Sequence, residues 1–225
     1  VINIKFNKIF SKITAVKFLK NIIFKKINPR LIFVSNNFKF GNKRKGNVHL
    51  LKKFSKKYNY RLVNTLAFRY KGKVVSSSKI RKSLQSGRLD LANTLLSRTW
   101  FIDGIVQKGK KLGKKLGYPT CNINIKNYVL PKIGIYVVKV IIGKNKKIFD
   151  GIAYLGYRPT FGGKEIVLEV NIFGIKQNLY KRTLRVYFLK FIRGEQKFKD
   201  STSLMKQMNK DVIFAKKSLK TKLAL

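Results

Sequence analysis

Apolar residues recur at two different spacings along the chain, and the change falls near residues 97–100. Before it, the stretch 14–25 carries five large apolar residues at helical spacing and predicts a helix that ends before Pro29. Short apolar runs predict strands at 31–34 and 61–68, and helices are predicted at 48–54, behind the serines at 76–78, and at 89–96. Mixed helices and strands indicate an α/β fold for this part of the chain.

After residue 97 the apolar residues mostly alternate with polar ones. This period predicts strands at 133–142, 147–155, 166–173 and 183–191, separated by turns rich in Gly, Asn or Lys. Strands at this spacing indicate a small antiparallel barrel or sandwich. The last stretch, 201–217, returns to helical spacing and predicts a closing helix that packs on the strands. We therefore expect two domains, 1–97 and 98–225.

Composition is that of a globular protein, since 44% of the 225 residues are hydrophobic and Gly and Pro are not in excess. The single cysteine, Cys121, cannot form an internal disulfide or a Cys/His metal cluster. Every apolar run is too short to cross a membrane. We expect a cytoplasmic protein without a membrane partner. The chain begins on Val1, which suggests a truncated start or a non-standard start codon.

The charge is extreme, with 52 Lys and Arg against 8 Asp and Glu and a formal net charge of +44. One interpretation is a nucleic-acid-binding module. The other is compositional drift towards Lys, Asn and Ile. It is favoured because the lysines are distributed along the whole chain and are not concentrated in one segment. Non-specific adhesion to nucleic acid at low salt is expected in either case.

The scarcity of acidic residues narrows the chemistry. Any general base or carboxylate ligand must come from eight residues: Asp90, Asp103, Asp150, Glu165, Glu169, Glu195, Asp200 and Asp211. The only histidine is His49, so a mechanism that needs two histidines is excluded.

A loop with glycines four residues apart, set among lysines, is the first candidate for chemistry. Gly109, Gly113 and Gly117 can let backbone N–H groups approach a polyphosphate, while Lys115 adds charge. The loop lacks the closing Gly-Lys-Ser/Thr of a Walker A motif. On spacing alone, a flexible basic turn explains it equally well.

The residues that follow favour phosphate binding. Pro119 fixes the backbone ahead of Thr120, and Thr120 and Asn122 point the same way in an extended segment. A hydroxyl and an amide side by side are plausible oxygen ligands for Mg²⁺ and partners for phosphate.

Glu169 lies in an otherwise apolar predicted strand and would share a face with Asn171. A lone carboxylate is costly to bury without a partner. It either faces water from an edge strand or acts as a general base in a pocket, where desolvation can raise its pKa.

Together these motifs resemble the bacterial riboflavin kinase/FAD synthetase family. The resemblance covers about residues 100–217 and follows the family's order: the Gly-x₃-Gly-x₃-Gly-Tyr-Pro-Thr-x-Asn signature, Pro131–Tyr136, Gly151–Phe161, Leu168–Val170, Leu179–Tyr180, Phe188–Phe198 and Asp211. It implies a six-stranded antiparallel barrel with a C-terminal helix. It also implies phosphorylation of the riboflavin 5′-hydroxyl by ATP to give FMN.

Carried over residue by residue, the resemblance implies that Gly109, Gly113, Lys115, Gly117, Pro119 and Thr120 hold the ATP phosphates. Thr120 and Asn122 would hold Mg²⁺, and Glu169 would be the catalytic base. Arg193, Glu195 and Tyr180 would bind riboflavin or FMN. Cys121 stands where the family usually has Ala, which we expect to be harmless. This parts list is what phosphoryl transfer requires, chiefly positioning and charge neutralisation.

The front part resembles the back portion of the family's Rossmann-like FAD synthetase (nucleotidyltransferase) domain. One remnant motif spans residues 38–47 and includes Gly41 and Arg44. The other spans residues 75–81 and includes Ser76, Ser77, Ile80 and Arg81. Its hydroxyl groups and its Arg lie at the start of a predicted helix, where they can bind an anion. The family's His-x-Gly-His motif is absent, and Ser35 and Asn37 replace its usual Gly and Asp.

We therefore expect an incomplete α/β remnant with little or no adenylyl transfer. An incomplete sheet would be poorly stable, or a separate upstream polypeptide would complete it. Intact bifunctional FMN and FAD synthesis stays open if the chain is a fragment of a longer protein. A decaying gene product without activity is the last alternative, opposed by the joint retention of Thr120, Asn122, Glu169 and Arg193.

Overall fold

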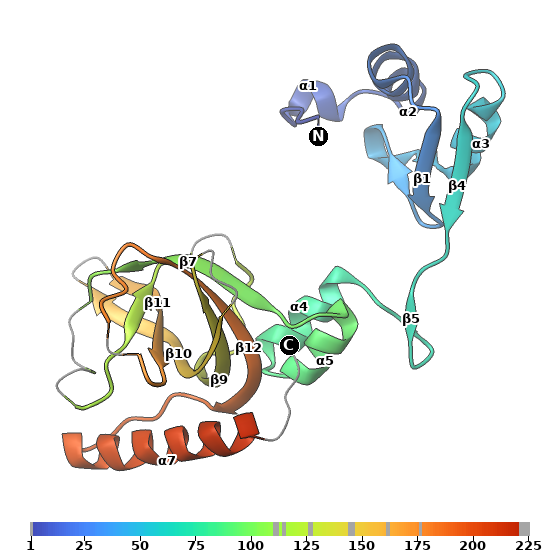
Figure 1. The fold of residues 1–225 in the computed structure, drawn as a ribbon. Helices are drawn as coiled ribbons and strands as arrows, with labels where there is room; N and C mark the ends of the chain where they lie inside the picture. The colour runs from blue at the N-terminus through green and yellow to red at the C-terminus, as the bar shows by residue number, and fades with distance from the viewer. Residues whose placement is uncertain are drawn as a thin grey trace. The chain divides into compact units, whose positions relative to one another are not determined.

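The computed structural model describes residues 2–109, 113, 116–125, 128–143, 147–160, 163–175 and 177–220 (Figure 1). The chain divides into two compact units, Val1–Val75 and Ser76–Leu225. The predicted α/β front and barrel back are both present, so the predicted fold class is confirmed.

The first unit is built around one parallel pair of strands, β1 and β4, in register from Leu31 against Arg61 to Ser35 against Thr65. Helix α3 lies between them in the sequence, which makes a β-α-β unit. Its elements are α1 (Lys8–Ser11), α2 (Ala15–Phe18), the π-helix η1 (Leu19–Ile27), β1 (Leu31–Ser35), β2 (Lys39–Phe40), the 3₁₀ helix η2 (Asn42–Arg44), β3 (Gly46–Asn47), α3 (Val48–Ser55), β4 (Arg61–Thr65), β5 (Arg69–Tyr70) and β6 (Lys73–Val74).

The helix predicted at 14–25 is present as α2 continued by η1. Thr14 caps it, accepting a hydrogen bond from the backbone N–H of Lys17 at 3.3 Å. It ends at Asn28, which adopts a left-handed conformation immediately before Pro29. Its apolar face supplies Leu19 and Phe24 to a core shared with Val34, Leu51 and Tyr60. The front of the chain thus has a small hydrophobic core of its own.

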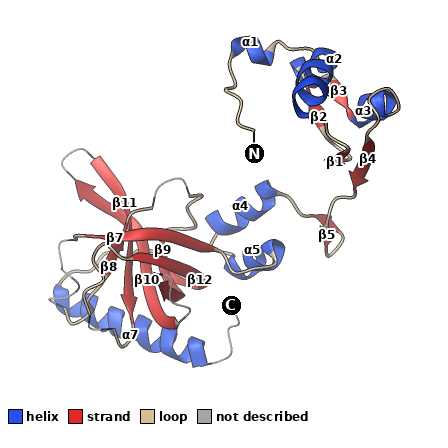
Figure 2. Ribbon diagram, turned by 45° about the horizontal axis from the view of Figure 1, so that its top comes forward, coloured by secondary structure: helices blue, strands red, loops and turns tan. Residues whose placement is uncertain are grey.

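The second unit is a closed six-stranded barrel in the order β10-β11-β8-β7-β12-β9, with antiparallel pairing throughout (Figure 2). The alternation seen in the sequence fills its interior with one set of side chains, including Tyr136, Val138, Leu168, Val170 and Phe188. The strands are β7 (Phe101–Gln107), β8 (Cys121–Ile123), β9 (Gly134–Ile142), β10 (Ile148–Thr160), β11 (Gly163–Ile172) and β12 (Thr183–Arg193).

The helices α4 (Ser77–Gln85), α5 (Leu89–Leu96) and α7 (Ser201–Lys220) accompany the barrel. Asn93 in α5 donates to the Phe188 carbonyl at 3.2 Å and accepts from the Trp100 N–H at 2.8 Å. Leu84 and Leu89 join the barrel core. By packing, therefore, α4 and α5 belong with the barrel, whereas the boundary predicted from sequence, 97/98, comes after them.

Helix α7 runs along the outside of the barrel (Figures 1 and 2) and contacts β9 and β10. Its fully buried Ala215 packs with Val137 and Leu189, which point outward from the strands. Asp200 caps the helix by accepting from the Ser203 N–H at 2.7 Å. The predicted closing helix is therefore confirmed and extends to Lys220.

Candidate functional site

A row of residues crosses the outer surface of the barrel from strand to strand. Directly paired residues point to the same side of a sheet, and the strand pairing links six such residues in one line. They are Arg193 (β12), Ile135 (β9), Tyr154 (β10), Glu169 (β11), Asn122 (β8) and Gln107 (β7). Their strand neighbours, such as Leu155, Leu168 and Ile123, point into the core instead. The row brings together predicted site residues from distant parts of the sequence.

Glu169 stands in the middle of this row and is half-buried. Thr120, immediately before β8, donates a hydrogen bond from its hydroxyl to Glu169 Oε2 at 3.2 Å. Asn171, on the same face of β11, donates to the Pro119 carbonyl at 2.6 Å. The structure therefore brings three predicted site residues into one cluster: Thr120, Asn122 and Glu169. The hydrogen bond from Asn171 holds the backbone next to Thr120 against β11.

Two residues of the predicted glycine loop, Gly109 and Gly113, lie against this cluster. A Cβ at Gly109 would overlap the Asn122 amide nitrogen and lie 2.6 Å from Asn122 Cγ, so the backbone of Gly109 packs directly on that side chain. The Gly113 carbonyl accepts from the N–H groups of Leu116 at 3.1 Å and Tyr118 at 2.8 Å, which closes a turn. Gly117 has φ +84°, a conformation that favours glycine. Lys115 lies outside the described residues.

Cys121 faces the opposite way from its neighbours Thr120 and Asn122, packing against the barrel core. Burial raises the pKa of its thiol, which keeps it neutral. Its place among the core side chains explains why a small residue suits this position.

Tyr154 lies next to Glu169 on the side away from Asn122, as its cross-strand partner. Its hydroxyl donates to the carboxylate of Glu195, which follows β12. This pair is possible because residue 156 is glycine: a Cβ there would collide with the Tyr154 ring and come within 2.5 Å of Glu195 Oε1. No local pattern in the sequence marks Tyr154 as a site residue, and only the register of β10 against β11 reveals its place.

Arg193 makes an ion pair with Asp211 of α7. Its guanidinium contacts both carboxylate oxygens, at 2.6 Å from Nη2 to Oδ2 and 3.0 Å from Nε to each oxygen. Gln207 donates to the same carboxylate at 2.8 Å. The Asp211 side chain is only 5% exposed and that of Arg193 16%. Arg193 therefore joins α7 to the barrel at the end of the row.

The three residues predicted to bind flavin do not form one cluster. Glu195 follows the end of β12 beside Tyr154, and Arg193 is the last residue of that strand. Tyr180 precedes the start of β12, and the Lys108 ammonium lies 5.7 Å from its ring centre. The 11-residue strand that separates Tyr180 from Arg193 spans about 35 Å.

The predicted adenylyltransferase motif is split between the two units. Gly41, at φ +71°, packs on the backbone of Ala15, and the next residue, Asn42, bonds to the Ser11 and Ile13 carbonyls. Arg44 lies in η2. In the second unit, Ser76 caps α4 by accepting from the Lys79 N–H at 3.3 Å. Ser77 begins α4, Arg81 contacts the Ser78 hydroxyl, and Ile80 packs against the barrel core.

Among the described residues, no group of three or more His, Cys, Asp and Glu side chains could hold a metal ion. The oxygen donors available at the site are the Thr120 hydroxyl, the Asn122 amide and the Glu169 carboxylate. Such hard donors, few in number, match Mg²⁺, which keeps several waters and shares phosphate oxygens with its substrate. None of the described helices is long and apolar enough to cross a membrane.

Comparison with known proteins agrees with this geometry. The family model described as riboflavin kinase matches residues 96–219, and the model described as FAD synthetase matches residues 1–79. A bifunctional riboflavin kinase/FMN adenylyltransferase of Buchnera aphidicola (subsp. Schizaphis graminum) is 40% identical, over 96% of this chain and 70% of its own length. The Escherichia coli K12 protein of the same description is 33% identical, over 96% and 69%.

A solved structure shows the same fold. The crystal structure titled macrolide-efflux protein from Streptococcus pneumoniae superposes with a TM-score of 0.82 at 29% identity, over 94% of this chain and 68% of that one. The riboflavin kinase match covers the whole barrel and the site on its surface, and the FAD synthetase match covers the first unit and the start of α4. The chain therefore belongs to the bifunctional riboflavin kinase/FMN adenylyltransferase family, and its barrel is a riboflavin kinase domain.

Proposed function

We propose that the row on the barrel surface is the phosphoryl-transfer site of the kinase, with Glu169 as the general base. The observation that supports this most is the position of Glu169: of the six residues in the row, it carries the carboxylate, and it stands between two distinct polar groups. Thr120 and Asn122 lie on one side and Tyr154 with Glu195 on the other. A base between a nucleotide side and an acceptor side is what the reaction requires.

The nucleotide side is the glycine loop with Thr120. Gly109, Gly113, Gly117, Pro119 and Thr120 would surround the ATP phosphates, with Lys115 adding charge. Thr120 and Asn122 would hold Mg²⁺, which supplies neutralisation of the phosphate charge when it is bound. Because Gly109 packs on Asn122, a larger residue at position 109 would displace the Asn122 side chain, which is one of the two proposed Mg²⁺ ligands.

The acceptor side is the surface around Tyr154, where riboflavin would lie. Glu195 and Arg193 border it, whereas Tyr180 lies at the opposite end of β12, beside Lys108. In the reaction, Glu169 accepts the proton of the riboflavin 5′-hydroxyl as its oxygen bonds to the γ-phosphorus of ATP. The bond from that phosphorus to the bridging oxygen breaks, and the products are FMN, ADP and a proton. A cytoplasmic location suits these substrates.

We propose that the first unit is not a working adenylyltransferase, so that the 225-residue chain makes little or no FAD. The single histidine, His49, cannot supply a nucleotide-binding motif that needs two histidines. Ser35 and Asn37 occupy the positions where the family usually has Gly and Asp, and the Ser35 hydroxyl donates a hydrogen bond to the Asn37 side chain. Incubation of the pure chain with FMN, ATP and Mg²⁺, followed by chromatography, should therefore give no FAD above the enzyme-free control. Robust FAD formation would show that the first unit retains a complete transfer site.

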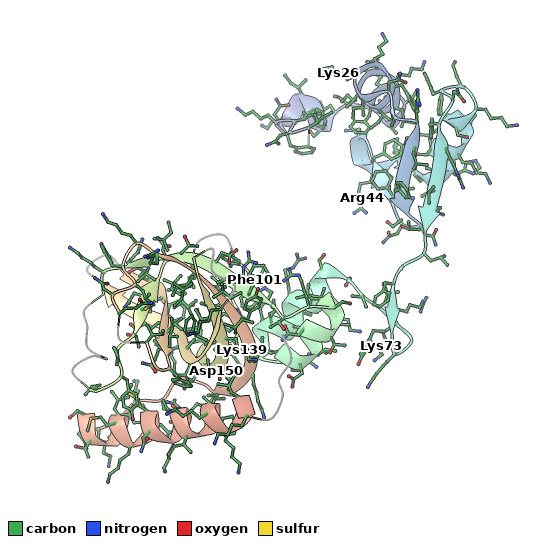
Figure 3. The ribbon with its side chains drawn as sticks, in the orientation of Figure 1. Lys26, Arg44, Lys73, Phe101, Lys139 and Asp150 are labelled. Atoms are coloured by element: carbon green, nitrogen blue, oxygen red, sulfur yellow. The ribbon has the colours of Figure 1, made fainter. Side chains whose placement is uncertain are left out.

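A second candidate function, nucleic-acid binding, is favoured by one observation in the first unit. All eight acidic residues of the chain lie after residue 75, so no carboxylate side chain offsets the lysines there. Figure 3 shows two of its basic residues, Lys26 on η1 and Arg44 at η2, on different elements. Most of the positive charge of the first unit is spread over several elements, as compositional drift predicts.

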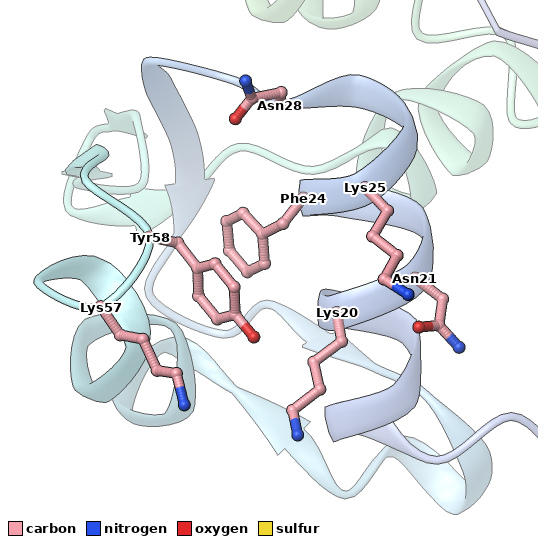
Figure 4. A pocket seen from close by; sticks show the side chains of 7 residues that line it. All are labelled: Lys20, Asn21, Phe24, Lys25, Asn28, Lys57 and Tyr58. Atoms are coloured by element: carbon pink, nitrogen blue, oxygen red, sulfur yellow. The ribbon is translucent and has the colours of Figure 1, made fainter.

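One concentration of charge lies at a pocket of about 450 Å³ beside η1 (Figure 4). Its lining includes Lys20, Lys25 and Lys57 together with the amides of Asn21 and Asn28. Tyr58 stacks on Phe24 at 3.9 Å between ring centres, which leaves the lysines and amides as the polar rim. Ammonium and amide groups at this density suit the phosphates of a single-stranded nucleic acid.

We expect the triple substitution Lys20→Gln, Lys25→Gln and Lys57→Gln to weaken binding of a fluorescein-labelled single-stranded RNA at least 10-fold at 150 mM salt. The slope of log affinity against log salt should fall by about 2, because each lost phosphate contact contributes about 0.7. The matched control removes the same charge at exposed Lys12, Lys53 and Lys73. Equal losses in the two variants would mean diffuse adhesion, and competition by tripolyphosphate would show whether free phosphate chains suffice.

A further inference from the structure

The contact between Tyr154 and Glu195 joins two parts of the barrel that are far apart in the sequence. Tyr154 lies within β10, whereas Glu195 lies on the segment between β12 and α7. Gly156 leaves the space in which the two side chains meet. A glutamate with an exposed side chain adopts many rotamers unless a contact restricts it. The Tyr154 hydroxyl therefore fixes where the Glu195 carboxylate stands.

Tyr154 is also coupled to the carboxylate at the centre of the row. Its pKa is raised, first by burial, then by the hydrogen bond and charge of Glu195, and also by the charge of Glu169. The phenol thus remains protonated at neutral pH and acts as a hydrogen-bond donor. Neighbouring strands are about 4.8 Å apart, so one cross-strand step separates Tyr154 from Glu169.

Tyr154 thus stands between two carboxylates of different freedom: Glu169 is its cross-strand partner and Glu195 is its hydrogen-bond acceptor. Glu169 is half-buried and accepts from Thr120, whereas Glu195 is exposed and accepts from Tyr154. The acceptor that Glu169 would deprotonate carries several hydroxyl groups in a row, since riboflavin has a ribityl chain. A carboxylate held one side chain away from the base can accept hydrogen bonds from the hydroxyls that precede the reacting one.

We propose that Tyr154 is a positioning residue of the kinase, which holds Glu195 on the acceptor side of Glu169 so that Glu195 orients the polyhydroxyl chain of the acceptor. The inference rests on the proposed function, because it takes Glu169 as the base and the Tyr154 side as the acceptor side. Tyr154 acts through Glu195, and its own ring forms the wall next to the reacting hydroxyl.

The test is Tyr154→Phe, which removes the hydroxyl and keeps the ring. Because hydrogen bonds to charged groups are among the stronger ones, we expect KM for riboflavin to rise about 5- to 20-fold. We expect kcat to change less than 3-fold and KM for MgATP to stay constant, since the nucleotide side is untouched. A residue with a merely structural role would lower thermal stability and leave the ratio of the two KM values unchanged.

A double-mutant cycle with Glu195→Gln separates this inference from the proposed base. If Tyr154 acts through Glu195, the two substitutions should have little more effect together than either has alone. Additive effects, or a riboflavin KM of Tyr154→Phe within 2-fold of the parent, would overturn the inference and leave the role of Glu169 intact. Full activity of Glu169→Gln with a raised riboflavin KM in Tyr154→Phe would instead reject the proposed base alone.

Discussion

Replacement of Glu169 by Gln is expected to lower kcat for riboflavin phosphorylation by about 10²- to 10⁴-fold, the usual effect of removing a general base. Glutamine has nearly the same shape and its carbonyl oxygen can still accept the hydrogen bond of Thr120. It cannot take up a proton at neutral pH. The loss should therefore appear in kcat, while KM for MgATP changes little because Thr120 and Asn122 stay in place.

Glu165→Gln is the matched control for this prediction. Glu165 lies on the same strand and the same face as Glu169, four residues away, and its side chain is exposed. The two variants make the same chemical change and should have similar thermal stability. A Glu169→Gln enzyme with kcat within 3-fold of the Glu165→Gln control would assign Glu169 to structure, and the base would have to be sought elsewhere.

The second large effect is expected on stability, at the ion pair between Arg193 and Asp211. Arg193→Ala leaves the Asp211 carboxylate, 5% exposed, with Gln207 as the side-chain donor that remains within the described part of the chain. Removal of one partner from a buried pair costs about 3–5 kcal/mol in the free energy of unfolding. For a unit of this size, the midpoint of thermal unfolding should fall by roughly 6–20 °C.

Trp100 gives the measurement, because it is the only tryptophan, it is buried in the barrel core, and its fluorescence follows the second unit. Arg185→Met is the control: it breaks the exposed Arg185–Asp103 pair, which should cost less than about 1 kcal/mol. Arg193→Met combined with Asp211→Leu should recover most of the lost stability, since it removes both charges. A fall for Arg193→Ala no larger than for Arg185→Met would mean that the pair does not anchor α7.

The same variants bear on the flavin role predicted for Arg193. A stable double variant with an unchanged KM for riboflavin would make Arg193 a residue of the α7 contact alone. A raised KM in that variant would place its guanidinium within reach of the flavin as well.

The sequence predicted which residues share a face of one strand better than it predicted which residues of neighbouring strands lie opposite one another. Alternation within β11 put Glu169 and Asn171 on one face, and the same spacing put Thr120 and Asn122 together; both are confirmed. Register between strands depends on pairing across the barrel, which a local pattern does not contain. For this reason Tyr154, the cross-strand neighbour of Glu169, was missed.

Short elements and long-range pairs were also beyond the local pattern. Strand β8 has three residues, too few for a period to be visible, and the resemblance rather than alternation pointed to six strands. The ion pair of Arg193 joins a strand end to a helix 18 residues later, and Tyr180 lies a whole strand away from Arg193. A family motif gives the order of such residues, whereas the fold decides which of them meet.

The most direct test of the proposed site is the structure of the chain with riboflavin, Mg²⁺ and a non-hydrolysable ATP analogue. The riboflavin 5′-oxygen should lie within about 3.2 Å of a Glu169 carboxylate oxygen, the reach of a general base. The nucleotide phosphates should lie on the Asn122 side of Glu169 and the flavin on the Tyr154 side. A 5′-oxygen far from Glu169, or the two substrates exchanged about it, would contradict the account.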